Sequence, residues 1–233
     1  MVKYLLRQNH GLASGFLSTT FLKNHPSLLR QLQEAGKYKT IIEEAAQKFN
    51  FQSCIIAGLG SRESHWGLAL FPPGPEGTGD FVPRIRTKPF RLTPLPPDGS
   101  GFGRGLLQID YDYHEFARTG NWRDPRENIF YGCKLLFDNR NLLRLPLHPP
   151  ALPSGIPQGR DPVKGHHPVQ GQQRYKLNHH QLIRATLSAY NCGLGKVRKT
   201  IDRGFDIDFF TTGRNYSLDV LNRTGWFQLQ GWS

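Results

Sequence analysis

A buried helix that ends beside a carboxyl group is predicted by the stretch Cys54-Ile55-Ile56-Ala57-Gly58-Leu59-Gly60-Ser61-Arg62-Glu63-Ser64-His65-Trp66-Gly67. Its first six residues are apolar or small, which is typical of a helix inside a core. Glu63 therefore stands at the end of an apolar helix, with Trp66 close by. Burial raises the pKa of a carboxyl group, so such a group can donate a proton near neutral pH. The alternative is a solvated or capped glutamate, which is common near helix ends.

Composition and charge narrow the class of protein. The 233 residues are 37% hydrophobic and 21% charged, which is typical of a globular chain. Lysine and arginine outnumber aspartate and glutamate by 30 to 18, and the formal net charge is +12. This excess favours an anionic partner such as nucleic acid, an anionic membrane surface or an acidic cell-wall polymer. No nucleic-acid-binding motif accompanies the charge, which argues against a nucleic-acid binder.

The sequence shows no clear targeting segment, and its cysteines indicate no disulfide or metal site. No apolar run approaches the length of a membrane span, so stable membrane insertion is not expected. The apolar core of Met1–His10 is broken almost at once, which does not resemble a signal peptide and leaves the location of the protein open. Cys54, Cys133 and Cys192 lie far apart and fit neither a disulfide framework nor a zinc site. We expect buried free thiols and no metal or other cofactor.

Helical patterns run along much of the chain. Residues 1–26 show no clear period and predict an irregular arm, followed by a short helix that Gly36 ends. A second helix is expected over residues 41–49, and Ser53 is the expected N-cap of the helix that carries Glu63. Further helices are expected after Asp124–Pro125, over residues 182–193 and over residues 213–223.

Two proline-rich inserts interrupt this pattern. Residues 71–97 interleave proline with arginine and lysine, which excludes a central strand or helix and predicts a long surface loop. Residues 144–180 are also rich in proline and contain the histidines His148, His166, His167, His179 and His180. A histidine-rich tract can bind a metal ion. These histidines lie mostly in adjacent pairs with no carboxylate cluster, so a solvated basic loop is the better interpretation.

A glycine-rich turn and a short strand are predicted between the inserts. The run Asp98-Gly99-Ser100-Gly101-Phe102-Gly103 favours tight turns, and Leu106–Asp110 has the pattern of a strand. Side chains alternate across a strand, so Gln108 and Asp110 are expected to point toward the same face.

Four motifs in a fixed order resemble the goose-type lysozymes. They are Ser61-Arg62-Glu63-Ser64-His65, Gly105-Leu106-Leu107-Gln108-Ile109-Asp110, Ser188-Ala189-Tyr190-Asn191, and Tyr216 with Asp219. That family belongs to a lysozyme-like superfamily to which the soluble lytic transglycosylases are related. The resemblance covers about residues 37–226. It implies an α+β, mainly α, lysozyme-like fold with a small β-sheet beside a cleft and two proline-rich loop inserts.

The resemblance also implies a domain organisation and an activity. An N-terminal arm with a short helix (1–36) would precede a catalytic domain (37–228, with inserts at about 71–97 and 144–180) and a tail (229–233). The family cleaves the β-1,4 bond between N-acetylmuramic acid and N-acetylglucosamine in peptidoglycan, and its catalytic acid falls on Glu63. Peptidoglycan strands are then the expected partner of a monomer that acts on the cell wall, with anionic wall polymers as further ligands.

Two aspartates match positions that place the attacking water in goose-type hydrolases. One is Asp110, and the other is Asp98, whose register is shifted by one extra residue near Arg104. A turn aspartate that accepts backbone hydrogen bonds is the alternative for Asp98, and a strand-end aspartate bonded to its neighbours is the alternative for Asp110. A lytic transglycosylase needs no such water, so the two acids favour hydrolysis.

Further residues match positions around the substrate in the family. They are Gln108, Tyr190, Asn191, Tyr216, His114 and Ser64, the two tyrosines lining the cleft near the acid. Trp66 replaces a small residue of the family, and we expect it to narrow the cleft beside Glu63. A lytic transglycosylase with the same acid, or a non-catalytic peptidoglycan- or chitin-binding module, remains the alternative to a hydrolase.

Overall fold

The computed structural model describes residues 2–4, 17–87, 90–145 and 177–233. Within these residues the helices are α1 (Pro26–Gly36), α2 (Lys39–Phe49), α3 (Ser53–Ser64), α4 (Phe116–Thr119), α5 (Pro125–Arg144), α6 (His179–Cys192), α7 (Leu194–Asp202) and α8 (Tyr216–Leu229), with a 3-10 turn at Thr212–Arg214. The strands are β1 (Val2–Tyr4), β2 (Leu17–Thr19), β3 (Thr78–Gly79), β4 (Arg84–Thr87), β5 (Phe90–Thr93), β6 (Gly103–Arg104) and β7 (Ile109–Asp110).

The strands form small antiparallel sheets, in the orders β1-β2, β3-β6-β7 and β4-β5. Helices dominate the rest of the described chain, and β3-β6-β7 is the small sheet that the sequence predicts. The predicted α+β, mainly α, lysozyme-like class is therefore confirmed.

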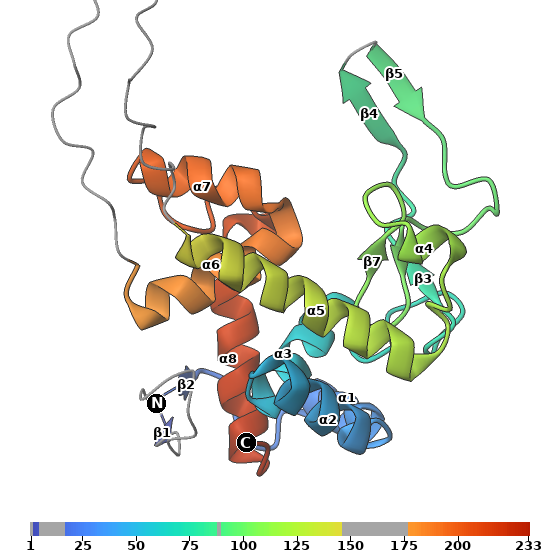
Figure 1. Cartoon of the computed structure of the whole chain (residues 1–233). Coiled ribbons are helices and arrows are strands. Elements are labelled where there is room, and N and C mark those ends of the chain that lie inside the picture. The colour runs from blue at the N-terminus through green and yellow to red at the C-terminus, as the bar shows by residue number, and fades with distance from the viewer. Residues whose placement is uncertain (1, 5–16, 88–89, 146–176) are drawn as a thin grey trace, which may run out of the picture.

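Helix α3 lies at the centre of the core. Nearly all of its residues are buried, and α8 packs along it (Figure 1). The two helices approach closely at Gly58, where a Cβ atom would lie 2.5 Å from Thr224 Oγ1 and 2.9 Å from the Val220 carbonyl oxygen. A side chain at this position would push the helices apart, so Gly58 sets the packing that orients the end of α3.

Trp66 belongs to this core and does not face a cleft. His65, Trp66 and Gly67 all have positive φ, which turns the chain back after α3. The Trp66 side chain is 1% exposed, and its Nε1 donates to the Ala57 carbonyl oxygen at 2.9 Å. Gly60 gives the ring its space, since a Cβ there would lie 2.6 Å from the indole. The expectation that Trp66 narrows the cleft is therefore wrong.

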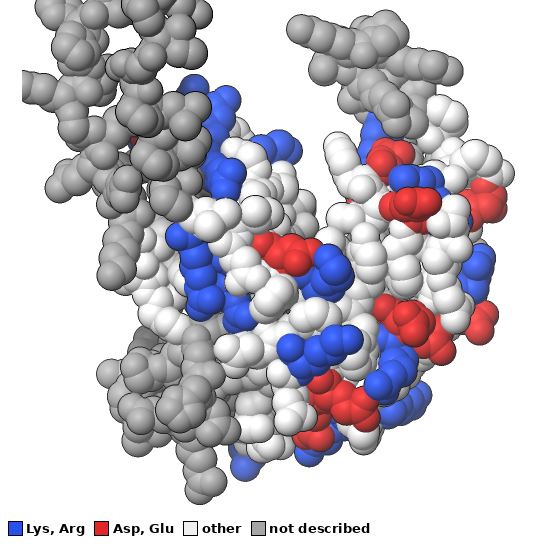
Figure 2. All heavy atoms as spheres, in the orientation of Figure 1, with Lys and Arg blue, Asp and Glu red and all other residues white. Residues whose placement is uncertain are grey.

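Two groups of elements flank the C-terminal end of α3, which carries Glu63. We call α6, α7 and α8 the helical lobe, and residues 71–87 and 90–119 the sheet lobe. The sheet lobe carries α4 and the projecting β4-β5 hairpin, and α5 runs from below it toward the helical lobe (Figure 1). Figure 2 shows the surface hollowed between the two lobes.

The structure corrects several local predictions. Residues 1–26 contain the β1-β2 pair rather than only an irregular arm, and residues 71–97 contain β3, β4 and β5 rather than only a loop. Gln52 occupies the N-cap of α3, while Ser53 begins the helix and donates its hydroxyl to the Ser233 carbonyl oxygen at 2.6 Å. His179 and His180 begin α6, so the second insert ends earlier than predicted.

The structure describes the predicted cysteines and part of the histidine-rich insert. His148, His166 and His167 lie outside the described residues, as does most of the second insert. Cys54 and Cys133 are buried free thiols, and Cys192 is partly exposed. Across the described ranges, no helix is both long and apolar enough to cross a membrane. The same ranges contain no group of three or more His, Cys, Asp or Glu side chains that could hold a metal ion.

Asn128 fixes the turn that joins β6 to β7. Its buried side chain accepts from the Leu107 N–H at 2.9 Å and donates to the carbonyl oxygens of Arg104 and Trp122 at 3.0 and 3.1 Å. Gly105, with φ of +66°, passes so close that a Cβ would lie 2.4 Å from the Asn128 amide nitrogen. One side chain on α5 thus satisfies three backbone groups and sets the path of the turn.

We expect Asn128→Ala to lower the free energy of unfolding by roughly 2–4 kcal/mol, because three buried backbone groups lose their partner. Urea denaturation followed by circular dichroism measures this. The exposed Asn121 provides the matched control, and Asn121→Ala should change stability by less than about 0.5 kcal/mol. Equal small losses in both variants would contradict the role assigned to Asn128.

Candidate active site

Glu63 lies in the last turn of α3, partly buried, as the sequence predicts. The Tyr216 hydroxyl donates a hydrogen bond to its Oε1. Burial raises the pKa of Glu63 to about 7, and the Tyr216 hydrogen bond and the Arg62 charge, which lower it, only partly offset this effect. A carboxyl group with this pKa is partly protonated near neutral pH and can act as a general acid.

Tyr216 is held in place by the first turn of α8. The phenol ring is buried, and the Arg62 guanidinium lies 5.7 Å from its centroid. Arg62 itself contacts Asp219, with 3.3 Å between Nε and Oδ2. Asp219 also pairs with Arg223 one turn further along α8, at 3.0 Å. These contacts join the end of α3 to the start of α8 and keep the hydroxyl directed at Glu63.

Asp208 is a further residue behind Tyr216, and no pattern in the sequence points to it. Its carboxylate is 0% exposed and accepts from the Ser217 N–H at 2.9 Å, from the Ser217 hydroxyl at 2.7 Å and from the Ser188 hydroxyl at 2.7 Å. Arg184 completes the group with an ion pair at 3.2 Å. Burial alone would raise the pKa of Asp208, but these bonds hold it below its usual value. Asp208 thereby ties α6 to the start of α8.

Tyr190 connects the helical lobe to the sheet lobe. It lies near the end of α6, and its hydroxyl donates to the Leu107 carbonyl oxygen at 2.6 Å. Burial and the nearby Glu63 carboxylate both raise the pKa of the Tyr190 phenol, burial being the larger cause. Glu63 therefore stands where the two lobes meet, next to both predicted tyrosines.

Ser64 has a structural role. Its side chain is 1% exposed, and its hydroxyl donates to the Leu106 carbonyl oxygen at 2.6 Å and accepts from the Gly67 N–H at 3.0 Å. A residue buried in this way cannot contact a substrate. The prediction of Ser64 as a substrate-binding residue is therefore wrong, and its hydroxyl instead fixes the end of α3 against the sheet lobe.

Gln108 lies in a turn rather than in a strand. Its φ of +49° and the short β7 limit the predicted strand over residues 106–110 to its last two residues. The Gln108 amide nitrogen donates to the Gly105 carbonyl oxygen at 2.8 Å. Its Oε1 occupies the space that a Cβ would need at Gly79 and Gly103, at 2.3 and 2.2 Å. These glycines give the amide its place over the small sheet.

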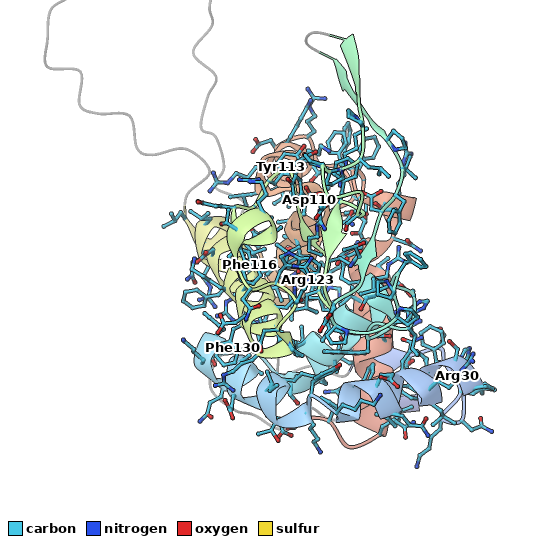
Figure 3. All side chains as sticks on the ribbon, turned by 90° about the vertical axis from the view of Figure 1, so that its right-hand side faces the viewer. Arg30, Asp110, Tyr113, Phe116, Arg123 and Phe130 are labelled. Carbon is cyan, nitrogen blue, oxygen red and sulfur yellow. The ribbon has the colours of Figure 1, made fainter. Side chains whose placement is uncertain are left out.

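Asp110 ends β7 and forms a two-pronged ion pair with Arg84. The two terminal nitrogens of Arg84 reach Oδ1 and Oδ2 of Asp110 at 3.0 and 2.7 Å, and the Asp112 N–H donates to Oδ1 at 2.8 Å. Figure 3 looks onto the sheet lobe and labels Asp110 below Tyr113 and above Phe116. Asp110 is partly exposed, so it remains accessible from this surface.

Asp98 pairs in the same way with Arg104, a residue that is 0% exposed. The distances to its two oxygens are 2.9 and 3.0 Å, and the Ser100 N–H donates to Oδ1 at 3.1 Å. The hydrogen bonds from Arg104 are the main reason why the pKa of Asp98 lies below its usual value. Asp98 thus neutralises a buried guanidinium and closes a turn.

The two remaining predicted residues flank the lobes. The Asn191 side-chain oxygen accepts from the Thr212 N–H at 2.9 Å, which joins α6 to the turn before α8. His114 is partly buried and shares a hydrogen bond of 3.3 Å between its Nδ1 and the Tyr131 hydroxyl. Burial lowers the pKa of His114.

The raised pKa of Glu63 predicts a pH-dependent stability. Between pH 4.5 and about 7 the folded protein keeps the proton that the unfolded chain has lost, so stability falls as pH rises through this window. The loss is about 3 kcal/mol relative to Glu63→Gln, which has no such proton. Urea denaturation from pH 4 to pH 8 measures the difference. The exposed Glu43 provides the control, because Glu43→Gln should retain the wild-type slope; a Glu63→Gln variant with that same slope would contradict the prediction.

Comparison with known proteins shows which proteins this chain is similar to. No family model matches the chain. Lysozyme g of Casuarius casuarius is 28% identical over 202 residues, which are 86% of this chain and 78% of the relative. Lysozyme g of Gallus gallus is 27% identical over 204 residues (87% and 69%), and that of Takifugu rubripes is 26% identical over 193 residues (82% and 74%). The chain is therefore a homologue of the goose-type lysozymes.

Proposed function

We propose that this protein is a muramidase that hydrolyses the β-1,4 bond between N-acetylmuramic acid and N-acetylglucosamine in peptidoglycan. Its homology to proteins named lysozyme g makes it a glycoside hydrolase of the lysozyme class. The observation that carries the finer proposal is the Glu63 carboxyl, with a pKa of about 7 at the junction of the two lobes.

Glu63 acts as the general acid. Cleavage of a glycosidic bond needs a proton on the leaving oxygen while positive charge builds at the anomeric carbon. A protonated Glu63 supplies that proton, and the Tyr216 hydroxyl holds the carboxyl in place. The residues that contact the sugars or shape the surface around them are Tyr190, Tyr216, Gln108, Asn191 and His114.

Asp110 holds the attacking water in this proposal, with Asp98 as the second candidate. An inverting enzyme places a second carboxylate far enough from the acid to admit a water molecule. Asp110 suits this role better, because it lies directly beyond the turn that contacts Tyr190 and Ser64. Asp98 pairs with the buried Arg104, so its first role is to neutralise that guanidinium.

Peptidoglycan is the partner that the charge also favours. The formal net charge of +12 attracts anionic polymers and raises the rate at which they are encountered. Anionic wall polymers are therefore further ligands of the same surface, and the protein works as a monomer.

A lytic transglycosylase is the second candidate, and one observation favours it. Both oxygens of Asp110 and of Asp98 already accept hydrogen bonds from arginine. If neither acid can hold water, the substrate's own C6 hydroxyl would close onto the anomeric carbon and leave a 1,6-anhydro sugar. A non-catalytic binding module would have no use for a glutamate with a raised pKa.

We expect Glu63→Gln to lower the rate of peptidoglycan lysis by roughly 100- to 10,000-fold, because an amide cannot donate the required proton. Turbidity loss of a cell-wall suspension measures the rate, and sedimentation with the insoluble wall measures binding. Binding should persist, and Glu43→Gln should keep the wild-type rate. Full lysis by Glu63→Gln would remove Glu63 from the mechanism, and binding without lysis by the wild type would indicate a binding module.

Mass spectrometry of the released muropeptides distinguishes the two reactions. Hydrolysis leaves reducing N-acetylmuramic acid ends, whereas transglycosylation leaves anhydro ends that lack one water. We expect reducing ends from the wild type, and a large loss of rate in Asp110→Asn because the amide no longer accepts a proton from water. Anhydro products, together with an undiminished rate in Asp110→Asn, would establish the transglycosylase instead.

A further inference from the structure

Arg84 sits at the centre of three carboxylates in the sheet lobe. It is the first residue of β4, at the base of the projecting hairpin (Figure 1). Its terminal nitrogens contact Asp80 at 2.7 Å, Asp110 at 2.7 and 3.0 Å, and Asp112 at 3.2 Å. No other residue of the candidate site has as many acidic partners within the described part of the chain.

The guanidinium is also fixed by an aromatic ring. Arg84 stacks over Phe102, with 4.0 Å between the guanidinium carbon and the ring centroid, and Phe102 is itself buried. An arginine held on one face by a ring and along its edge by carboxylates has little freedom to rotate. The orientation of Arg84 is therefore set before any ligand arrives.

This fixed fork leaves a defined acceptor position on Asp110. A carboxylate offers about four acceptor positions on its two oxygens. Within the described residues, Oδ1 of Asp110 accepts from Arg84 and from the Asp112 N–H, whereas Oδ2 accepts from Arg84 alone. The geometry keeps one position on Oδ2 for a further donor and fixes its direction.

We propose that Arg84 is the positioning residue for Asp110 and directs the remaining acceptor position of this carboxylate toward the attacking water; this rests on the proposed hydrolytic function. Arg84 does not itself contact the reacting atoms. Without it, both oxygens of Asp110 would lose the guanidinium that fixes them, and the side chain would be free to rotate away from its present orientation. The proline-rich insert 71–97 thereby supplies a part of the site that lies outside the four family motifs.

The proposal predicts a loss of turnover rather than of binding. With soluble peptidoglycan fragments as substrate, Arg84→Ala should lower kcat by about 10- to 100-fold with little change in KM, because the water is misplaced while the sugars still bind. Arg84→Lys should recover only part of the loss, since an ammonium restores the charge but not the two-pronged geometry. Thermal denaturation of each variant monitors folding. The exposed pair Arg126–Glu44 supplies the control, and Arg126→Ala should keep the wild-type kcat.

A double-mutant cycle separates positioning from a merely structural role. If Arg84 acts through Asp110, Arg84→Ala should lower kcat less than about twofold in the Asp110→Asn background. A wild-type kcat in Arg84→Ala, or a full additional loss in the double variant, would overturn the inference while Asp110→Asn alone still lost activity. A wild-type kcat in Asp110→Asn, or anhydro products from the wild-type protein, would instead overturn the proposed hydrolysis, and the inference with it.

Discussion

The desolvation of one carboxyl group is the constraint on which the rest of the structure depends. Glu63 can remain protonated near neutral pH only if water is largely kept from it and few donors stabilise its charge. The Tyr216 hydroxyl donates a hydrogen bond to it, and Asp208 fixes the first turn of α8, which carries Tyr216. Gly58 serves the same end, because it lets α8 pack closely against the helix that carries the acid. The core of this protein thus doubles as the environment that tunes one pKa.

The carboxylates of the sheet lobe have the opposite surroundings, because they are paired with arginines. Asp98 and Asp110 each bind an arginine through both oxygens. Among the described residues, Glu63 instead accepts a hydrogen bond from the Tyr216 phenol and lies near the charge of Arg62. Burial raises the pKa of Glu63, whereas the hydrogen bonds from Arg104 lower the pKa of Asp98. Pairs of acidic groups whose pKa values are separated by their surroundings are the usual arrangement for acid catalysis beside a charged carboxylate. The same type of side chain therefore provides a proton donor at Glu63 and an arginine-paired carboxylate in the sheet lobe.

Local patterns predict the parts of this site that local structure determines. The apolar helix before Glu63 and the helix expected over residues 213–223 follow from the pattern of neighbouring residues. The first is confirmed, and the second exists but begins later than predicted, at Tyr216. The strand predicted at Gln108 is wrong. The alternating pattern suggests a strand, whereas the close packing of the sheet glycines around the Gln108 amide requires a turn with positive φ. Asp208 and Arg84 have partners 20 or more residues away along the chain, and such pairings leave no periodic signal. The sequence thus predicts the acid, while the support of that acid on both lobes depends on tertiary contacts.

The division between hydrolysis and ring closure depends on these tertiary contacts more than on the acid. Both reactions begin with the same proton transfer, so a glutamate in an apolar setting does not distinguish them. The product is decided by the oxygen that reaches the anomeric carbon first. A carboxylate that turns freely holds water in many orientations, whereas Asp110, held by Arg84 and by the Asp112 N–H, holds it in one. Arg84 occupies one acceptor position on each oxygen of Asp110, and the Asp112 N–H occupies a third. The acceptor position that stays open is then fixed in direction, and this makes it more effective at orienting a water molecule.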